Sequence, residues 1–300
     1  MRKFPIRKIT IIPLLVIFIT ACVSYNPDSE TDSVSDLHFD TAVQIEDIEF
    51  TPAGWPEPLT ADLTLPDKKG PLPVVLTIHG GGWSDRDRSD MNGIGAKLVE
   101  QGYAVLNMSY RFAPVHRYPA QLNDVQQAIG WIADHAKQYD LDVSRINTWG
   151  YSSGAHLAAL VASYDDNRLE SEYDQKLPTI RSVVAGGIPA DLRQYSESPI
   201  ISNFIGGFRE QMPDEYADAS PAFHIDSNDP PVFLYHGKLD FLVKPDQSIN
   251  YYQSLRDAGI DAELYLHSLH THITLFLLGA DADEKAINFL NRKNLMVPTG

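Results

Sequence analysis

The chain has 300 residues, of which 43% are hydrophobic and 21% are charged. This balance is typical of a globular protein and excludes disorder along the whole chain. Forty acidic residues against 24 basic ones give a net charge of −16, which argues against a nucleic-acid partner held by its phosphates. A single cysteine excludes an internal disulfide framework and a cysteine-rich zinc site.

Residues 1–21 have the pattern of an export signal. Four basic residues precede an apolar run from Ile9 to Ile19, which ends at the small residues Thr20 and Ala21. The run is shorter than the roughly 20 residues that a membrane-spanning helix needs. We therefore predict a signal peptide and a protein that works outside the cytoplasm.

Cys22, the only cysteine, follows this signal directly. The run Ile19-Thr20-Ala21-Cys22 resembles a bacterial lipobox, and the resemblance implies cleavage before Cys22 and lipidation of that residue. We expect a lipoprotein anchored on the extracytoplasmic side of a membrane, in the periplasm or at the cell surface. A plain secretory signal with an incidental cysteine, or an uncleaved anchor, is the alternative.

The next segment, residues 22–40, is acidic and poor in apolar side chains. Such a composition predicts a flexible tether. The pattern changes at about residue 41, and we predict one domain over residues 41–295.

An antiparallel hairpin opens the predicted domain. Residues 43–50 and 61–65 alternate apolar and polar side chains, and the segment between them is rich in proline. Continuous apolar runs then predict strands buried on both faces; they cover residues 74–79, 103–108, 146–150, 180–185, 232–235 and 262–266. Helices fit between them, at residues 94–99, 121–139, 155–163, 248–258 and 284–292.

This alternation predicts an α/β fold, with a mostly parallel central sheet and helices on both of its faces. Residues 187–231 are the longest stretch without a clear place in that sheet. We expect them to form a small lid at most. Phe204, Phe208 and Met212 of this stretch either line a pocket or pack on the sheet.

The first chemical motif is Gly150-Tyr151-Ser152-Ser153-Gly154, a G-x-S-x-G match between a predicted strand and a predicted helix. In this context the motif predicts a nucleophile elbow, a tight turn that presents Ser152 above the sheet. The flanking glycines fit because the turn leaves no room for side chains. Ser153 as the nucleophile would break the spacing; its amide instead lies at a helix N-terminus, where it can stabilise an anion.

The second motif, His79-Gly80-Gly81-Gly82-Trp83, follows the strand at residues 74–78. Consecutive glycines expose backbone N–H groups, and we predict that the amides of Gly81, Gly82 and Ser153 form an oxyanion hole. A plain flexible turn is the alternative, whereas the missing GK[ST] excludes a Walker-type phosphate loop. We expect His79 to order the loop. Trp83 and Tyr151 are the predicted substrate contacts, although Trp83 could equally belong to the core.

Two further motifs supply an acid and a base. Asp240 follows the strand at residues 232–235, where a carboxylate can orient a histidine; Asp246 is the alternative, at a position that suits a helix start. His272 follows the strand at residues 262–266, with His270 as the alternative base. The histidines at 267, 270 and 272 lack the spacing of a helical metal site, so we predict no metal. We expect His156 to be packed in the interior.

The order Ser152, Asp240, His272 resembles that of α/β-hydrolases. The chain looks like a carboxylesterase of this fold with an HGGGW oxyanion loop, similar to bacterial acetyl and feruloyl esterases and, more loosely, to hormone-sensitive-lipase-like esterases. Residues 109–114 and 118–120 resemble the family's SYRLAP and FPA segments. The resemblance covers residues 70–290.

The chain departs from the family pattern in three places, one of which is that no large N-terminal cap region is visible. Tyr151-Ser152-Ser153 replaces the Asp-Ser-Ala of hormone-sensitive-lipase relatives, which favours the acetyl and feruloyl esterases. Residues 273–275 read Ile-Thr-Leu where Gly-Phe is more common, which keeps His270 open as the base.

The resemblance implies hydrolysis of small esters with short acyl groups through an acyl-enzyme, with no metal or organic cofactor. An amidase or peptidase such as an arylformamidase is the first alternative. A lipase or polyester hydrolase and a catalytically silent surface binding protein are the others.

Overall fold

The computed structural model describes residues 24–25, 38–163 and 176–294. The predicted signal, Cys22 and most of the predicted tether lie outside these residues. Within them, no helix is both long and apolar enough to cross a membrane.

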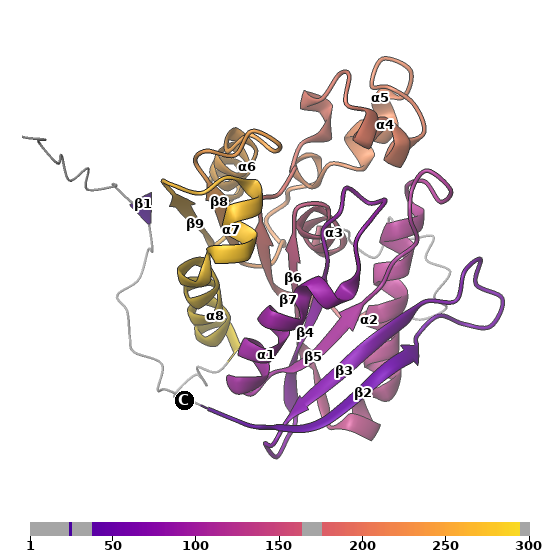
Figure 1. Cartoon of the computed structure of the whole chain (residues 1–300), viewed down its shortest axis with the longest axis vertical. Coiled ribbons are helices and arrows are strands. Elements are labelled where there is room, and N and C mark those ends of the chain that lie inside the picture. The colour runs from indigo at the N-terminus through magenta and orange to yellow at the C-terminus, as the bar shows by residue number, and fades with distance from the viewer. Residues whose placement is uncertain (1–23, 26–37, 164–175, 295–300) are drawn as a thin grey trace, which may run out of the picture.

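Among the described residues, nine strands form one sheet in the order β1-β9-β8-β7-β6-β4-β5-β3-β2 (Figure 1). The six strands β4 to β9 run parallel to one another, whereas β1, β2 and β3 pair antiparallel with their neighbours. Their bounds are β1 Ser24–Tyr25, β2 Thr41–Glu49, β3 Thr60–Pro66, β4 Leu72–Ile78, β5 Ala104–Met108, β6 Leu141–Tyr151, β7 Ile180–Gly186, β8 Val232–Gly237 and β9 Ala262–His267.

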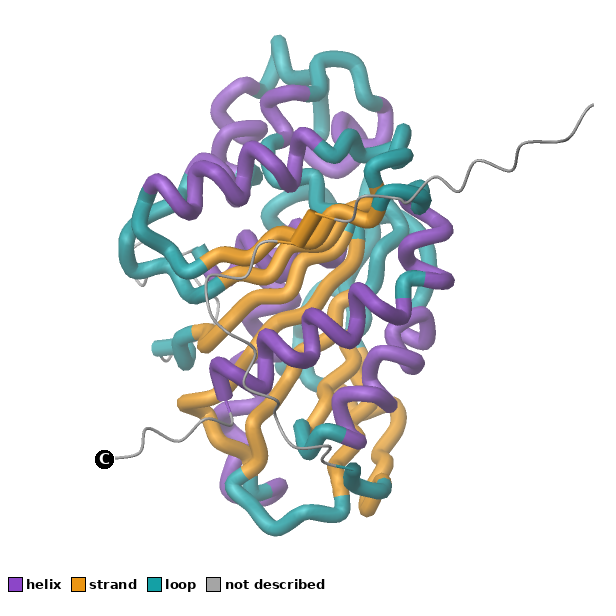
Figure 2. The backbone as a smooth tube through the Cα atoms, turned by 90° about the vertical axis from the view of Figure 1, so that its left-hand side faces the viewer, coloured by secondary structure: helices purple, strands orange, loops and turns teal. Residues whose placement is uncertain are grey.

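Helices cover both faces of the sheet (Figure 2). Neighbouring residues of the inner strands point to opposite faces, so that Val74 and Val75 of β4 belong to different apolar clusters. One cluster contains side chains of α2 (Ala120–Tyr139), α3 (Ser153–Ala162) and α6 (Asp246–Asp257). The other contains side chains of α1 (Asn92–Glu100) and α8 (Ala280–Asn294). Both faces of the parallel strands are therefore buried, as their continuous apolar runs predict.

Three short helices that the sequence did not reveal lie at the end of the sheet where the parallel strands finish (Figure 1). They are α4 (Pro199–Ile205), α5 (Pro213–Asp218) and α7 (His272–Leu278). Single 3-10 turns occur at Arg88–Met91, Leu192–Gln194 and Pro221–Phe223. The stretch at residues 187–231 thus contains α4 and α5 and stands beside the strand ends.

The predicted α/β fold is confirmed, including the antiparallel hairpin of β2 and β3 and every predicted inner strand. The largest difference in bounds is at β6, which begins at Leu141 rather than at Ile146. The early part of β6 is only partly buried and carries polar residues, so it shows no apolar run.

Candidate active site

Ser152 lies in a strained turn between β6 and α3. Its backbone has φ +55° and ψ −121°, a conformation that residues with side chains rarely adopt. The Ser152 amide donates a hydrogen bond to the Gly186 carbonyl at 2.8 Å, which fixes the turn against β7. This is the geometry of a nucleophile elbow, and it exposes a serine hydroxyl at the end of the sheet.

The glycines on either side of the turn are required by close backbone contacts. A Cβ at Gly150 would lie 2.2 Å from the carbonyl carbon of Gly154, and one at Gly154 would lie 2.1 Å from the Ile78 oxygen. Both neighbours are backbone atoms, which cannot rotate away. The predicted reason for these glycines is therefore confirmed.

The glycine loop after β4 lies against this turn. A Cβ at Gly80 would be 3.0 Å from the Tyr151 oxygen and 3.4 Å from the Ser152 Cβ. Gly81 and Gly82 have φ +117° and +62°, and within the described part of the chain their amides donate no hydrogen bond. Unpaired N–H groups beside the serine of the elbow have the donor character that an oxyanion hole needs.

His79 orders this loop, as predicted. Its buried ring stacks on Tyr110 with centroids 4.4 Å apart, and its Nδ1 donates to the Gly80 carbonyl at 2.7 Å. Burial lowers the pKa of His79, which favours the neutral ring.

Asp240 is buried at the end of β8 and accepts four hydrogen bonds. Its Oδ1 accepts from the amides of Leu242 and Val243, both at 2.9 Å, and its Oδ2 accepts from His272 Nδ1 at 2.6 Å and from His236 Nε2 at 3.0 Å. Burial alone would raise the pKa of Asp240, but the hydrogen bonds from the two histidines outweigh it and hold the pKa well below its usual range. Asp240 is therefore ionised at neutral pH.

His272 is the first residue of α7, and a capping box fixes this position. The Thr271 amide donates to Thr274 Oγ1 at 2.8 Å, and the Thr274 amide donates to Thr271 Oγ1 at 3.4 Å. Thr274 thus has a structural role in the segment that departs from the family pattern. Because Nδ1 of His272 donates to Asp240, Nε2 is the nitrogen left to act as a base.

The alternative residues do not contact this pair. His270 packs its ring on His267 with centroids 4.0 Å apart, and Asp246 is exposed in the first turn of α6. His156 is buried with Nε2 donating to the Ala219 carbonyl at 2.6 Å, which confirms its packed position. Within residues 24–25, 38–163 and 176–294, no group of His, Cys, Asp or Glu side chains is arranged to hold a metal ion.

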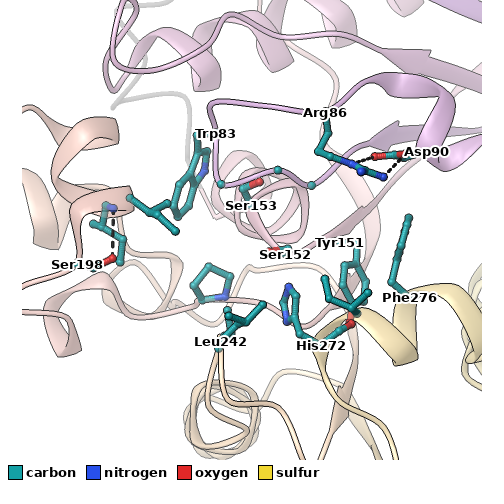
Figure 3. A pocket seen from close by; sticks show the side chains of 18 of the residues that line it. Trp83, Arg86, Asp90, Tyr151, Ser152, Ser153, Ser198, Leu242, His272 and Phe276 are labelled. Carbon is teal, nitrogen blue, oxygen red and sulfur yellow. Dashed lines mark hydrogen bonds and ion pairs between the residues drawn. The ribbon is translucent and has the colours of Figure 1, made fainter.

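A cavity of about 420 Å³ opens over Ser152 (Figure 3). Ser152 and Ser153 lie at its centre, with Trp83 and Arg86 on one side and His272 and Leu242 on the other (Figure 3). The predicted residues Gly81, Gly82 and Tyr151 line it as well. All the predicted site residues that the structure describes therefore line this pocket, except Asp240. Asp240 is connected to the pocket through its hydrogen bond with His272.

Trp83 belongs to both the pocket and the core. It lines the cavity, yet it is buried and stacks on Phe204 with centroids 4.3 Å apart. Phe204 is fully buried and does not line the cavity, and Met212 packs on the same apolar cluster, so the packing alternative is correct for both. Phe208 is exposed and also lies outside the cavity wall.

Several wall residues had no signal in the sequence. From the stretch at residues 187–231 they are Pro189, Tyr195, Ser198, Ile200 and Ile201, and from the β8 and α7 sides they include Val243, Ile273, Phe276 and Leu277. They reach the pocket only through the tertiary fold.

Arg86 also lines the pocket, and its guanidinium forms an ion pair with the Asp90 carboxylate through two contacts of 2.7 Å. The only sign of this ion pair in the sequence is its spacing, with a basic residue four positions before an acidic one.

Tyr151 also holds α7 in place. Its hydroxyl donates to the His272 carbonyl at 2.6 Å, and its ring centroid lies 5.1 Å from that of His272. Burial raises the pKa of Tyr151, so the hydroxyl stays protonated and remains a donor.

Gly187 sets the space available to the His272 ring, and we expect Gly187→Ala to lower hydrolytic activity. At φ +57°, its Cβ would lie 2.9 Å from His272 Cε1 and 3.2 Å from Nδ1. The ring would have to move, and a displacement on the order of 1 Å can cost roughly 100-fold in rate. Steady-state kinetics on a soluble ester measure this loss.

Gly259→Ala is the matched control for this substitution. Gly259 has a similarly unfavourable φ of +83°, but nothing lies within 4 Å of its Cβ position. It shares the backbone strain without the contact to His272. Equal losses of activity in the two variants would contradict the steric explanation.

Comparisons with known proteins identify a family and several relatives of this chain. The family model BD-FAE matches residues 61–255. Esterase LipQ of Mycobacterium tuberculosis is 29% identical over 246 residues, covering 77% of this chain and 57% of the relative. Esterase LipC of the same organism is 28% identical over 197 residues, covering 62% and 49%. The chain thus spans about half the length of these curated relatives.

Solved structures give the same fold. A truncated carbohydrate esterase from gut microbiota superposes with a TM-score of 0.75 at 23% identity, covering 88% of this chain and 99% of the other. A bifunctional GH43-CE protein of Bacteroides eggerthii also has a TM-score of 0.75, at 27% identity, covering 88% and 36%. The resemblance to α/β-hydrolase esterases stated from the sequence is confirmed, and the chain belongs to the BD-FAE family.

Proposed function

We propose that the protein is a serine carboxylesterase that hydrolyses short-chain acyl esters. The observation that carries this proposal is the 2.6 Å hydrogen bond from His272 Nδ1 to the buried carboxylate of Asp240, beside a cavity that His272 shares with the strained Ser152. An ionised acid, an oriented base and a nucleophile on an elbow are the three groups that acyl transfer by serine requires.

The proposed reaction has two halves. His272 Nε2 takes the Ser152 proton as Oγ attacks the ester carbonyl, and Asp240 stabilises the imidazolium that forms. The amides of Gly81, Gly82 and Ser153 hold the oxyanion, and loss of one such donor typically costs about 3 kcal/mol of barrier. The alcohol leaves with the proton from His272, and water then attacks the acyl-enzyme with His272 again as base.

The size of the cavity supports short acyl groups. Its volume of about 420 Å³ is near the lower end of the ~300–1,000 Å³ typical of ligand pockets. Trp83 and Ile201 are buried wall residues, and they leave little room for a long chain on their side.

A chain-length series tests this proposal. We expect hydrolysis of p-nitrophenyl acetate and butyrate, a decline toward the decanoate, and much slower turnover of the matched anilide. Ser152→Ala should lower kcat by about 10⁶-fold, with EDTA having no effect on the wild type. A folded wild-type protein that cleaves the anilide but not the esters would replace the esterase with an amidase.

We also propose that the protein is exported and attached to a membrane through a lipid on Cys22. This proposal rests on the signal pattern of residues 1–21 and on the single cysteine that follows it. Metabolic labelling with a fatty-acid analogue, compared between wild type and Cys22→Ser, tests it. Equal labelling of the two proteins would contradict it.

A further inference from the structure

We propose that an apolar rim beside the mouth of the cavity docks on a lipid bilayer, so that the pocket opens toward the membrane surface. The rim consists of two segments. Leu239, Phe241 and Leu242 lie on the loop between β8 and α6. Leu269, Ile273, Leu277 and Leu278 lie on the loop after β9 and on α7.

These side chains are unusually exposed for their size. Phe241 is 77% exposed, Leu269 is 69% exposed and Leu278 is 68% exposed, and the other four rim residues are more than half exposed. Single exposed apolar residues are normal, but a group of seven on adjoining segments marks an interaction surface.

The two segments form one surface. The amides of Lys238 and Leu239 donate to the carbonyls of His267 and His270, at 2.8 and 3.1 Å, which ties the two loops together. Leu242, Ile273 and Leu277 line the cavity over Ser152 while also being exposed. The rim is therefore continuous with the cavity mouth.

The charges on the two rim segments fit a bilayer surface that carries anionic headgroups. Residues 264–280 contain no Asp or Glu, and the exposed Asp281 follows this stretch directly. The loop between β8 and α6 has exposed lysines at Lys238 and Lys244, on either side of its apolar tip, and its one carboxylate, Asp240, is buried. Apolar side chains flanked by lysines suit the boundary between acyl chains and anionic headgroups.

The start of β1 lies at the end of the sheet where the rim is found. Ser24 pairs with Leu266 in an antiparallel register, so the chain enters β1 from the end of β9 that leads into the rim. Cys22 is two residues earlier in the sequence, and two residues of extended chain span at most about 7 Å. A lipid on Cys22 would hold the rim toward the bilayer.

Tryptophan quenching by brominated lipids tests the docking directly. The four native tryptophans, Trp55, Trp83, Trp131 and Trp149, are all buried, so an added surface tryptophan supplies the signal that lipids can reach. The full lipidated chain is placed on vesicles of phosphatidylethanolamine and phosphatidylglycerol. We expect brominated acyl chains to lower the added emission of Phe241→Trp and Leu278→Trp by about twofold or more, because docked rings reach the acyl boundary.

Val143→Trp is the matched control, since Val143 is exposed near the start of β6, at the opposite end of the sheet from the cavity. Its emission should not change. Equal emission of all three variants with and without bromine would overturn the proposal. So would a lipid-free dimer that buries both rim tryptophans, because the rim would then bind a second copy.

A double substitution, Phe241→Ser with Leu278→Ser, links docking to substrate access. Neither residue lines the cavity, so hydrolysis of dissolved p-nitrophenyl acetate should be unchanged. Hydrolysis of a short-chain ester carried in the vesicles should fall by about tenfold. The measurement with the vesicle ester rests on the proposed esterase activity, whereas the quenching measurement does not. A protein that docks but hydrolyses nothing would refute the proposed activity and leave the docking proposal standing.

Discussion

Replacing Asp240 by asparagine is expected to lower kcat for ester hydrolysis by about 10⁴-fold, the size of this effect in Ser-His-Asp hydrolases. The new side-chain amide would offer an N–H group where His272 Nδ1 now donates at 2.6 Å. His272 would then adopt the tautomer with its proton on Nε2, which cannot accept the Ser152 proton. Steady-state kinetics with p-nitrophenyl acetate measure the loss.

Asp246→Asn is the control for this prediction. Asp246 is six residues further on, exposed in the first turn of α6, and was the alternative acid in the sequence. Its replacement removes only a favourable helix-end charge, at about 0.3–1 kcal/mol of stability. Full activity in Asp240→Asn, or a comparable loss in Asp246→Asn, would contradict the assignment of the acid.

Gly154→Ala is expected to destabilise the protein by about 3 kcal/mol and to inactivate what remains folded. The added Cβ would lie 2.1 Å from the Ile78 oxygen and 2.5 Å from the His79 oxygen, so α3 would have to move away from β4. That movement displaces the Ser153 amide and the elbow. Thermal unfolding should show a fall of several degrees, at roughly 2–4 °C per kcal/mol for a domain of this size.

Gly93→Ala gives the matched control in α1. Nothing lies within 4 Å of a Cβ at Gly93, which is exposed and helical. Alanine there is expected to leave stability unchanged or to raise it by about 0.5–1 kcal/mol. If both glycine variants unfolded at the wild-type temperature, close packing at the elbow would not explain why residue 154 is a glycine.

The sequence predicted those parts of the fold that depend on local patterns. Val74 to Ile78 form a fully buried strand because every residue of the run is apolar or small enough to be enclosed on both faces. Ser152 could be found because the elbow imposes a spacing of glycines that is visible in the sequence. Its neighbours Gly150 and Gly154 have the close contacts that this spacing implies.

The rest depends on contacts between distant segments. A helix as short as α4 or α7 has too few residues for a helical period to emerge, and Thr271 and Thr274 form a capping box without the usual Glu or Gln. His236 precedes Asp240 by four residues, but their hydrogen bond could not be predicted from that spacing, since it depends on how the loop after β8 folds back. Gly187 likewise gains its importance only from the ring of His272.

Ser152 is the proposed nucleophile, and covalent labelling is a direct test of that role. An alkyl p-nitrophenyl phosphonate should form a bond from Ser152 Oγ to phosphorus and release one p-nitrophenolate per chain. Mass spectrometry of the labelled peptide should place the phosphonyl group on Ser152, and Ser152→Ala should remain unlabelled. A phosphonyl group on Ser153 or elsewhere, or no labelling of the folded wild type, would contradict the account.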